Sequence, residues 1–258
     1  IQKNLKMTNE KDASQSQPGF IGHLVELRNR LVHAILSILV IFIGLVYFAN
    51  DIYSFVAEPL ISTLPQGTSM IATDVTSPFF APFKLTLFVS LFLAFPFILH
   101  QIWGFIAPGL YKNEKRMLIP VLISSILLFY SGIAFCYFIV LPIILGFFTG
   151  VGPDMMTLSP DISSYLGFVL KLFFAFGITF EIPVAIMLLC WSGATDVKSL
   201  KEKRPYIVVG AFVVAMFLTP PDILSQTLLA IPMLALFELG LILASFSNKK
   251  QEPTEQEN

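Results

Sequence analysis

The sequence predicts an all-α membrane protein: six transmembrane helices in a kinked, concave bundle, with short fifth and sixth helices and both termini in the cytoplasm. Three observations support this fold class. Of the 258 residues, 55% are hydrophobic and 13% are charged, whereas about 25% of the residues in an ordinary soluble domain are charged. Six apolar segments approach the roughly 20 residues that a helix needs to cross a bilayer. Lysine and arginine gather between alternate segments, and prolines interrupt several of them.

The six segments predict one membrane domain over residues 21–247. The extension at 1–20 and the tail at 248–258 are too polar to form a core, so we expect both to be disordered. The predicted spans, in order, are 31–49, 85–105, 117–140, 162–190, 206–218 and 223–246.

The loops between the spans carry helix-start signals. In the long loop 50–83, the apolar residues of its first part recur at helical spacing, which is typical of a helix lying in the membrane interface. Ser77 and Ser159 each precede a proline and are predicted N-caps for the second and fourth spans. Within the apolar runs, prolines predict kinks and therefore a curved bundle. These prolines are Pro96, Pro142, Pro183 and Pro232.

The fifth span is short. Residues 206–218 would form a helix of about 20 Å, whereas the hydrocarbon core is about 30 Å thick. A tight turn at 219–222 separates this helix from the sixth. The pair is therefore predicted either to stop short of a full crossing or to sit in a thinned bilayer, unless the helix extends a turn beyond the apolar run.

The positions of the basic residues predict the topology. Fourteen of the sixteen lysines and arginines lie in 1–30, 106–116, 191–205 or after 246. These segments fall on one side of the predicted bundle, and an excess of lysine and arginine marks the cytoplasmic side. Both termini are therefore predicted to be cytoplasmic. The two remaining lysines, Lys84 and Lys171, lie at the start of one span and inside another.

No catalytic, metal or cofactor site is predicted. His23, His33 and His100 are scattered, and Cys136 and Cys190 read as small packing residues. No glycine-rich phosphate loop is present. We therefore expect neither an enzyme nor a nucleic-acid-binding protein, and no cofactor.

Two acids lie inside predicted spans, where each costs roughly 2.5–3.5 kcal/mol at the bilayer centre. Glu181 is deep in the fourth span, and Glu238 is in the sixth. Lys171 precedes Glu181 by about 15 Å along the helix, so the two do not form a simple ion pair. Glu181 is predicted to contact a guest helix or a water-lined cavity, or to hydrogen-bond between spans.

Two further acids lie on the predicted cytoplasmic side. Glu26 stands beside Arg28 and Arg30 at the mouth of the first span, and Glu114 stands in the link between the second and third. In a helix, Glu26 and Arg30 are four residues apart and can pair. Arginine binds carboxylates bidentately, so two acids near one surface can also receive two guanidinium groups from a ligand. The residues alone leave a structural role and a binding role equally open.

Several blocks resemble one known family. They are HLVELRNRL at 23–31, YFANDIY at 47–53, MIATDVTSPFF at 70–80, WGFIAPGLYKNEKR at 103–116, FGITFEIPVA at 176–185, KEKRP at 201–205 and FLTPPDILSQ at 217–226. On these blocks the chain, over about residues 20–248, resembles the TatC family, the polytopic subunit of the twin-arginine protein translocase, and its proteobacterial members in particular.

The resemblance implies a receptor for twin-arginine signal peptides that exports folded proteins and uses the proton motive force. It implies that Glu26 and Glu114 meet the two signal arginines, that Phe105 faces the apolar part of the signal, and that Arg28 orients the acids. The implied signal-binding positions, taken together, are Glu26, Arg28, Phe105, Leu110, Lys112 and Glu114.

The resemblance also implies further sites and partners. Pro59, Glu181 and Asp222 are implied transport positions, and Met216, Thr219 and Gln226 would line the docking region for single-span TatB or TatA helices. Other implied partners are membrane lipid and further TatC copies, in the bacterial cytoplasmic (inner) membrane. Two other classes stay open: a proton-coupled small-solute transporter with Glu181 and Glu238 as a relay, and a structural membrane scaffold.

Overall fold

The computed structural model describes residues 20–63, 70–106, 118–150, 159–219 and 223–248. These ranges are almost entirely helical, with one isolated bridge between Ile71 and Asp161 as their only β-type pairing. The helices in chain order are α1 (Phe20–Leu45), a 3₁₀ turn η1 (Val46–Phe48), α2 (Ala49–Thr63), α3 (Ser77–Ile106), α4 (Leu118–Phe135), a π-turn η4 (Cys136–Val140), α5 (Leu141–Gly150), α6 (Ile162–Thr179), α7 (Ile182–Trp191), α8 (Val197–Glu202), α9 (Arg204–Leu218) and α10 (Ile223–Asn248).

Within the described ranges, five helical stretches are long and apolar enough to cross a membrane, and α9 is a sixth, shorter apolar helix. The five stretches are Leu24–Ser62, Ser77–Gly104, Ile119–Gly150, Ile162–Trp191 and Ser225–Phe246. The predicted all-α, six-helix membrane class is confirmed. At 15 residues, α9 measures only about 22 Å. The prediction that the sixth helix is also short is wrong, because α10 continues through Pro232 for 26 residues, or about 39 Å.

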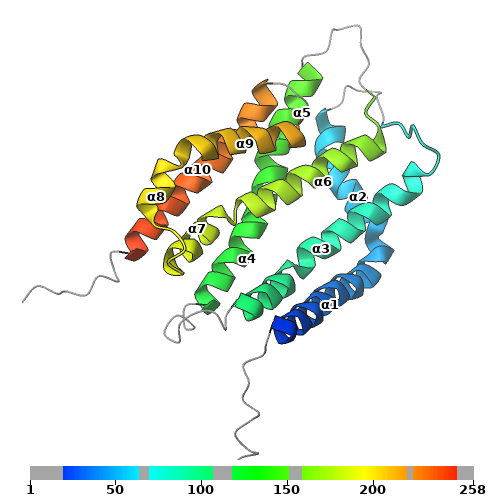
Figure 1. The fold of residues 1–258 in the computed structure, drawn as a ribbon. Coiled ribbons are helices and arrows are strands. Elements are labelled where there is room, and N and C mark those ends of the chain that lie inside the picture. The colour runs from blue at the N-terminus through cyan, green and yellow to red at the C-terminus, as the bar shows by residue number, and fades with distance from the viewer. Residues whose placement is uncertain (1–19, 64–69, 107–117, 151–158, 220–222, 249–258) are drawn as a thin grey trace, which may run out of the picture.

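The helices pack as a single tilted bundle (Figure 1). On one side α1 packs against α3, and on the other α10 packs against α7 and α9. Between them, α4 packs against α6. Where α4 and α6 cross, a β-carbon on Gly132 would lie only 2.7 Å from the carbonyl oxygen of Phe176. Glycine thus lets these two backbones approach closely, as small residues do between membrane helices.

The predicted kinks are found at two of the prolines. The π-turn η4 ends where the N–H of Leu141 donates to the carbonyl of Cys136, and Pro142 follows with no N–H of its own. The fourth span breaks at Phe180 and Glu181, so that α6 and α7 are separate helices. Pro183 explains this break, because its ring clashes with the carbonyl four residues earlier and it cannot donate a hydrogen bond.

Pro59, Pro82, Pro96 and Pro232 lie inside helices that continue past them. At Pro96 and Pro59, a tyrosine bonds the carbonyl that the proline leaves without a donor. Pro96 lies in α3, and the Tyr130 hydroxyl donates to the carbonyl of Phe92, four residues earlier, at 3.1 Å. Likewise Pro59 lies in α2, and the Tyr137 hydroxyl donates to the carbonyl of Phe55 at 2.9 Å. At these two prolines, a neighbouring segment therefore satisfies the carbonyl that proline frees, as the apolar interior of a membrane requires.

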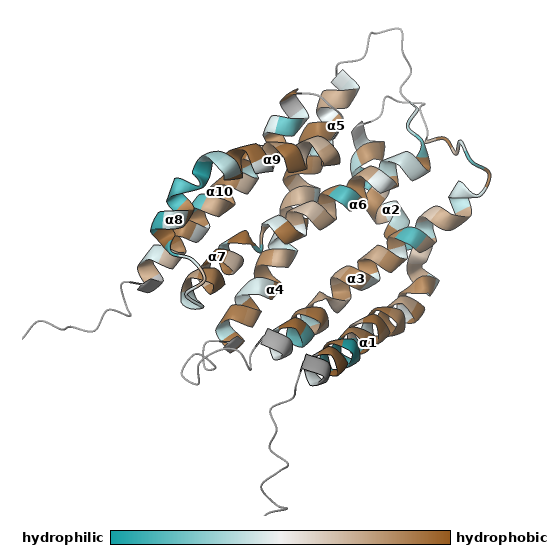
Figure 2. Ribbon diagram, in the orientation of Figure 1, coloured by the Kyte–Doolittle hydropathy of each residue, from teal (hydrophilic) through white to brown (hydrophobic). Residues whose placement is uncertain are grey.

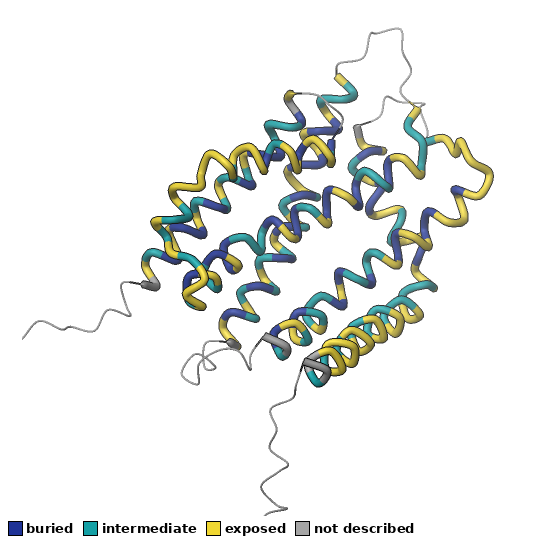
Figure 3. Tube along the Cα trace, in the orientation of Figure 1, coloured by how far each residue is buried: buried dark blue, intermediate teal, exposed yellow. Residues whose placement is uncertain are grey.

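The core lies where α2, α3, α4, α5 and α6 meet, and it is rich in phenylalanine. Figure 3 places buried residues along the inner faces of these helices, whereas α1 is largely exposed. The exposed faces are nevertheless apolar (Figure 2), as expected where lipid tails replace water as the solvent. Helix α2 is helical as predicted, but it does not lie free in the interface: Val56, Ala57 and Leu60 are buried in the core.

The two described loop segments at the end of the bundle where α3 and α6 begin are fastened together. The N–H of Ile71 donates to the carbonyl of Pro160 at 3.1 Å, and the N–H of Ile162 donates back to Ile71 at 2.9 Å. Asp161 accepts from the backbone N–H of Thr73 at 3.1 Å and from its hydroxyl at 2.8 Å. We call this set of contacts the Asp161 clasp.

The contacts at the starts of α3 and α6 differ from both predicted N-caps. Asp161, not Ser159, caps α6, because its carboxylate accepts from the N–H of Ser164 at 2.8 Å. Ser77 is the first residue of α3, and its hydroxyl accepts a bond from the Ser163 hydroxyl at 2.7 Å. The serine–proline pairs thus mark where both helices begin, and in α6 the capping oxygen comes from Asp161.

Candidate functional site

Glu26 lies near the start of α1 and is held there by an arginine of the same helix. The Nε and Nη2 atoms of Arg30 both donate to Oε1 of Glu26, at 3.0 and 2.6 Å. The pair is partly buried, with 26% of the Arg30 side chain and 37% of the Glu26 side chain exposed. This is the i,i+4 pair that the sequence predicts. Among the described residues, nothing bonds the second oxygen, Oε2.

Arg30 also reaches across to the end of α3. Its Nη1 atom donates to the carbonyl of Gln101 at 3.4 Å. The guanidinium lies so close over Gly104 that a β-carbon there would collide with Nη1. Beside this contact, Leu27, Leu31, Ala34, Ile98 and Ile102 line an apolar hollow of about 440 Å³ between the two helices.

Arg28 does not contact Glu26. It is exposed, and its Nη2 atom donates to the side-chain oxygen of the adjacent Asn29 at 3.2 Å. Residues two apart on a helix point in different directions, whereas residues four apart share a face. In the described structure, the arginine that bonds Glu26 is therefore Arg30 and not Arg28.

The other predicted members of the signal-binding set follow Gly104 in the sequence. Leu110, Lys112 and Glu114 lie outside the described residues, as does Asp222. Phe105 is the penultimate residue of α3, directly after Gly104, and its side chain is likewise outside the described part. The structure thus places the end of α3, from which the segment with Glu114 departs, beside the start of α1.

Glu181 lies at the break between α6 and α7, immediately before the first turn of α7. The Ser125 hydroxyl, on α4, donates to its Oε2 atom. Its Oε1 atom is buried and has no hydrogen-bond partner in the described structure. The hydrogen bond between spans, one of the two predicted roles, is therefore present, and one carboxylate oxygen remains for a further partner.

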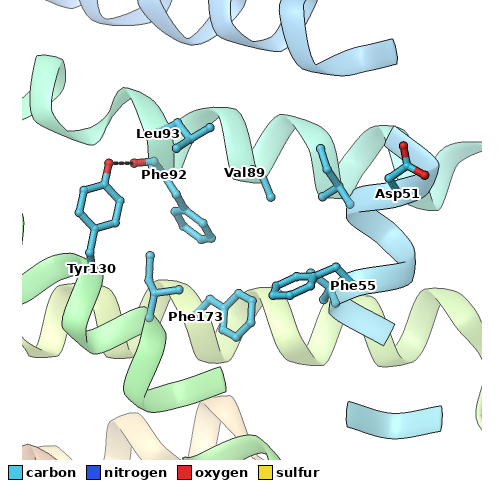
Figure 4. A pocket seen from close by; sticks show the side chains of 10 residues that line it. Asp51, Phe55, Val89, Phe92, Leu93, Tyr130 and Phe173 are labelled. Carbon is cyan, nitrogen blue, oxygen red and sulfur yellow. Dashed lines mark hydrogen bonds between the residues drawn. The ribbon is translucent and has the colours of Figure 1, made fainter. Parts of the chain in front are cut away.

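An apolar cavity of about 460 Å³ opens between α2, α3, α4 and α6 (Figure 4). Phe55, Phe92 and Phe173 project into it, Tyr130 closes one end with its bond to Phe92, and Asp51 lies at the other end. This cavity was not predicted from the sequence. The sequence feature that could have indicated the cavity is the pair of prolines Pro59 and Pro96. Each leaves the carbonyl four residues earlier without a helical donor, and these carbonyls belong to the lining residues Phe55 and Phe92.

The predicted partner-docking residues differ in exposure. Met216 is 49% exposed on α9. Thr219 is buried, and its hydroxyl donates to the carbonyl of Ala215 at 3.0 Å. Gln226, on α10, donates from Nε2 to the carbonyl of Phe212 on α9 at 3.0 Å. Gln226 therefore joins α10 to α9, Thr219 bonds back to its own helix, and Met216 is the most exposed of the three.

The relay postulated for a solute transporter is not supported. Glu238 pairs with Arg204 at 2.5 Å, and both side chains are close to half exposed. Glu238 is therefore a surface ion pair between α9 and α10 and not a buried partner of Glu181. Within the described ranges, no group of three or more His, Cys, Asp or Glu side chains is placed to hold a metal ion.

Comparison with known proteins assigns the family. Residues 22–232 match the family described as Sec-independent protein translocase protein (TatC). The chain is 56% identical over 247 residues to the TatC protein of Haemophilus influenzae, covering 96% of each chain. It is 59% identical over 231 residues to that of Escherichia coli K12, covering 90% of this chain and 89% of that one.

The fold agrees with the sequence match. A crystal structure of the twin-arginine translocase receptor TatC superposes with a TM-score of 0.79 at 39% identity, covering 88% of this chain and 99% of the other. The helical bundle, its candidate spans and the order of the motifs all fit this relationship. The chain belongs to the TatC family and is a multi-pass membrane component of the twin-arginine, Sec-independent protein translocase.

Proposed function

We propose that this chain is the signal-peptide receptor and core assembly platform of the translocase, in the bacterial cytoplasmic membrane with both termini in the cytoplasm. One observation carries the proposal furthest. Glu26 is held by Arg30 through Oε1 alone, beside the end of α3, and its Oε2 atom faces no described partner. A carboxylate in this state can accept a guanidinium group from a ligand without first losing its own arginine.

The remaining receptor residues belong to the same proposal. Glu114 supplies the second carboxylate for a twin-arginine motif, Lys112 and Arg28 complete the polar rim, and Leu110 adds an apolar contact. Phe105 follows Gly104 at the end of α3, where it receives the apolar part of the signal. Arginine suits such a site better than lysine, because its planar fork matches two carboxylate oxygens.

After docking, the apolar segment of the signal moves along the bundle toward Glu181. The unpartnered Oε1 atom of Glu181 supports this step, because a buried polar atom without a partner is costly until a guest supplies one. Pro59 and Asp222 act in the same transport stage. Single-span TatB and TatA helices dock near Met216, Thr219 and Gln226, and further copies and lipid complete an assembly driven by the proton motive force. The proposal assigns no catalysed reaction and no cofactor.

Replacement of either acid tests the receptor function. Glu26→Lys or Glu114→Lys places a cation where the signal arginine binds, and we expect at least a tenfold loss of precursor cross-linking. Assembly with TatB should stay within about twofold of the unaltered protein. Site-specific photo-cross-linking of a twin-arginine precursor measures the first quantity, and co-purification of TatB measures the second. Undiminished cross-linking in either variant would exclude that residue from the receptor site.

A further inference from the structure

We propose that Arg30 is a positioning residue of the receptor site: it holds Glu26 against the end of α3 and thereby fixes the direction of the free Glu26 oxygen. The inference rests on the proposed receptor function and adds a residue to it. The Arg30 side chain makes three contacts, with the Glu26 carboxylate, the Gln101 carbonyl and the backbone of Gly104, and these involve both helices that frame the site.

The contact with Glu26 uses only Oε1 and leaves Oε2 without a bond in the described structure. Both the Nε and Nη2 atoms of Arg30 bond Oε1 of Glu26, so the pair does not use the two-oxygen arrangement that a guanidinium can form. A ligand arginine therefore meets a carboxylate whose rotation is already restricted. Preorganisation of this kind strengthens binding because less freedom is lost when the ligand arrives.

The second and third contacts anchor the arginine itself. Nη1 bonds the carbonyl of Gln101, and the guanidinium lies against the backbone of Gly104, where any side chain would collide with it. The carbonyl belongs to the last turns of α3, whose carbonyls are the negative end of the helix dipole. A glycine at this position thus leaves the space that the guanidinium occupies.

A competing role for Arg30 is that of a placeholder which the ligand must displace. The geometry favours positioning, because Arg30 makes a bond to Gln101 that a ligand for Glu26 does not contest, and because Oε2 remains open. The two roles predict opposite results. Loss of a placeholder tightens ligand binding, whereas loss of a positioning group weakens it.

Two substitutions disrupt the contacts of Arg30 in different ways. Arg30→Gln removes the charge, and Gly104→Ala keeps every charge but displaces the guanidinium with a methyl group. Each has a matched control. Arg204→Gln breaks the other Arg–Glu pair of the described structure, at 2.5 Å between α9 and α10. Gly44→Ala places the same methyl group on α1, where nothing lies within 4 Å.

The experiment measures binding of synthetic signal peptides to the full chain in lipid nanodiscs, with Arg-Arg, Lys-Lys and Gln-Gln versions of one peptide. We expect Arg30→Gln and Gly104→Ala to weaken Arg-Arg binding at least tenfold. We also expect the preference for Arg-Arg over Lys-Lys to fall at least threefold, which a general loss of folded protein would not change. Both controls should stay within twofold of the unaltered protein. Tighter binding by Arg30→Gln, an unchanged preference, or an equal loss in Arg204→Gln would overturn the inference.

A second measurement separates this inference from the receptor function. Hydrogen–deuterium exchange without ligand should accelerate at least threefold at the end of α3, around Gln101, in Arg30→Gln and not in Arg204→Gln. If the unaltered protein does not distinguish Arg-Arg from Gln-Gln peptide, the receptor proposal fails. The exchange result still decides whether Arg30 stabilises the end of α3. Unchanged exchange in Arg30→Gln would show that Arg30 does not stabilise the end of α3, even if peptide binding is normal.

Discussion

At the residue scale, single carboxylates do different work at the two ends of the bundle. Glu26 keeps one oxygen unpaired beside α3, whereas Asp161 is saturated: it accepts from Thr73 twice and from the N–H of Ser164. These bonds hold the pKa of Asp161 below its ordinary range, and the bond from the Thr73 backbone N–H has the largest effect. The Thr76 backbone N–H and hydroxyl lower the pKa of Asp74 in the same way. Both groups are therefore charged at neutral pH.

The Asp161 clasp should consequently be insensitive to pH in the physiological range. A carboxyl whose folded pKa is depressed stabilises the fold above its unfolded pKa of about 3.9, and the contribution is lost as pH falls further. We expect Asp161→Ala to lower the thermal midpoint of the purified protein by the same amount from pH 5 to 8. That difference should shrink below about pH 4. Glu58→Ala, an exposed carboxylate of α2 without a hydrogen bond in the described structure, serves as control. A difference that disappears between pH 6 and 8 would contradict the assignment.

The residues that sequence could predict are those with local partners. The Glu26–Arg30 pair follows from a four-residue spacing on one helix. By contrast, the Asp161–Thr73 contact joins residues 88 apart, and Ser125 meets Glu181 across 56 residues. No local pattern indicates such pairs. The predicted Ser159 cap was wrong although the true cap is local: Asp161 accepts from the N–H of Ser164, three residues later, and its other oxygen bonds Thr73.

At the element scale, proline has two different consequences in this fold. Pro183 separates α6 from α7, whereas α3 continues past Pro96. The difference between a continued and a broken helix cannot be read from the proline alone. In α3, Tyr130 supplies a donor for the freed carbonyl of Phe92, whereas α10 continues past Pro232 with no such tyrosine bond in the described structure. The positions of the prolines therefore predicted where kinks are possible, but not which helices break.

The tyrosine–proline coupling can be measured with a double-mutant cycle. Tyr130→Phe leaves the Phe92 carbonyl without its donor, and we expect a loss of about 1–3 kcal/mol in unfolding free energy. In a Pro96→Ala background, the new N–H of residue 96 can bond that carbonyl, so the same tyrosine substitution should have little effect. Tyr47→Phe, at a residue 88% exposed, is the control. Equal losses in both backgrounds, measured by reversible unfolding in detergent, would contradict the coupling.

At the scale of the whole molecule, the lengths of the helices are unequal. Among the described residues, five helical stretches are long and apolar enough to cross a bilayer, but α9 measures only about 22 Å against a hydrocarbon core of about 30 Å. Its partner α10 is long enough, so the predicted thinning now depends on α9 alone. Composition and the spacing of apolar runs were sufficient to predict the fold class, because bilayer thickness limits what can span it. The cavity between α2, α3, α4 and α6 was not predictable, because it depends on how the helices tilt.

The short helix predicts a local change in the membrane. We expect the bilayer beside α9 to be thinner than the bilayer beside α1 by several ångströms, since a short span draws the lipid surfaces together. Cryo-electron microscopy of the protein in lipid nanodiscs, at a resolution that shows both headgroup layers, measures this directly. Full bilayer thickness beside α9 would show that the helix crosses by another arrangement.

The central claim is that this chain receives twin-arginine signals through Glu26, and export of a folded reporter tests it most directly. Cells that lack their own TatC would carry this chain together with TatA and TatB, and a reporter with an Arg-Arg or a Lys-Lys signal. The account predicts export of the Arg-Arg reporter only, and its loss by at least tenfold in Glu26→Lys with undiminished protein in the membrane. Export that is equal for both reporters, or unchanged in Glu26→Lys, would contradict it.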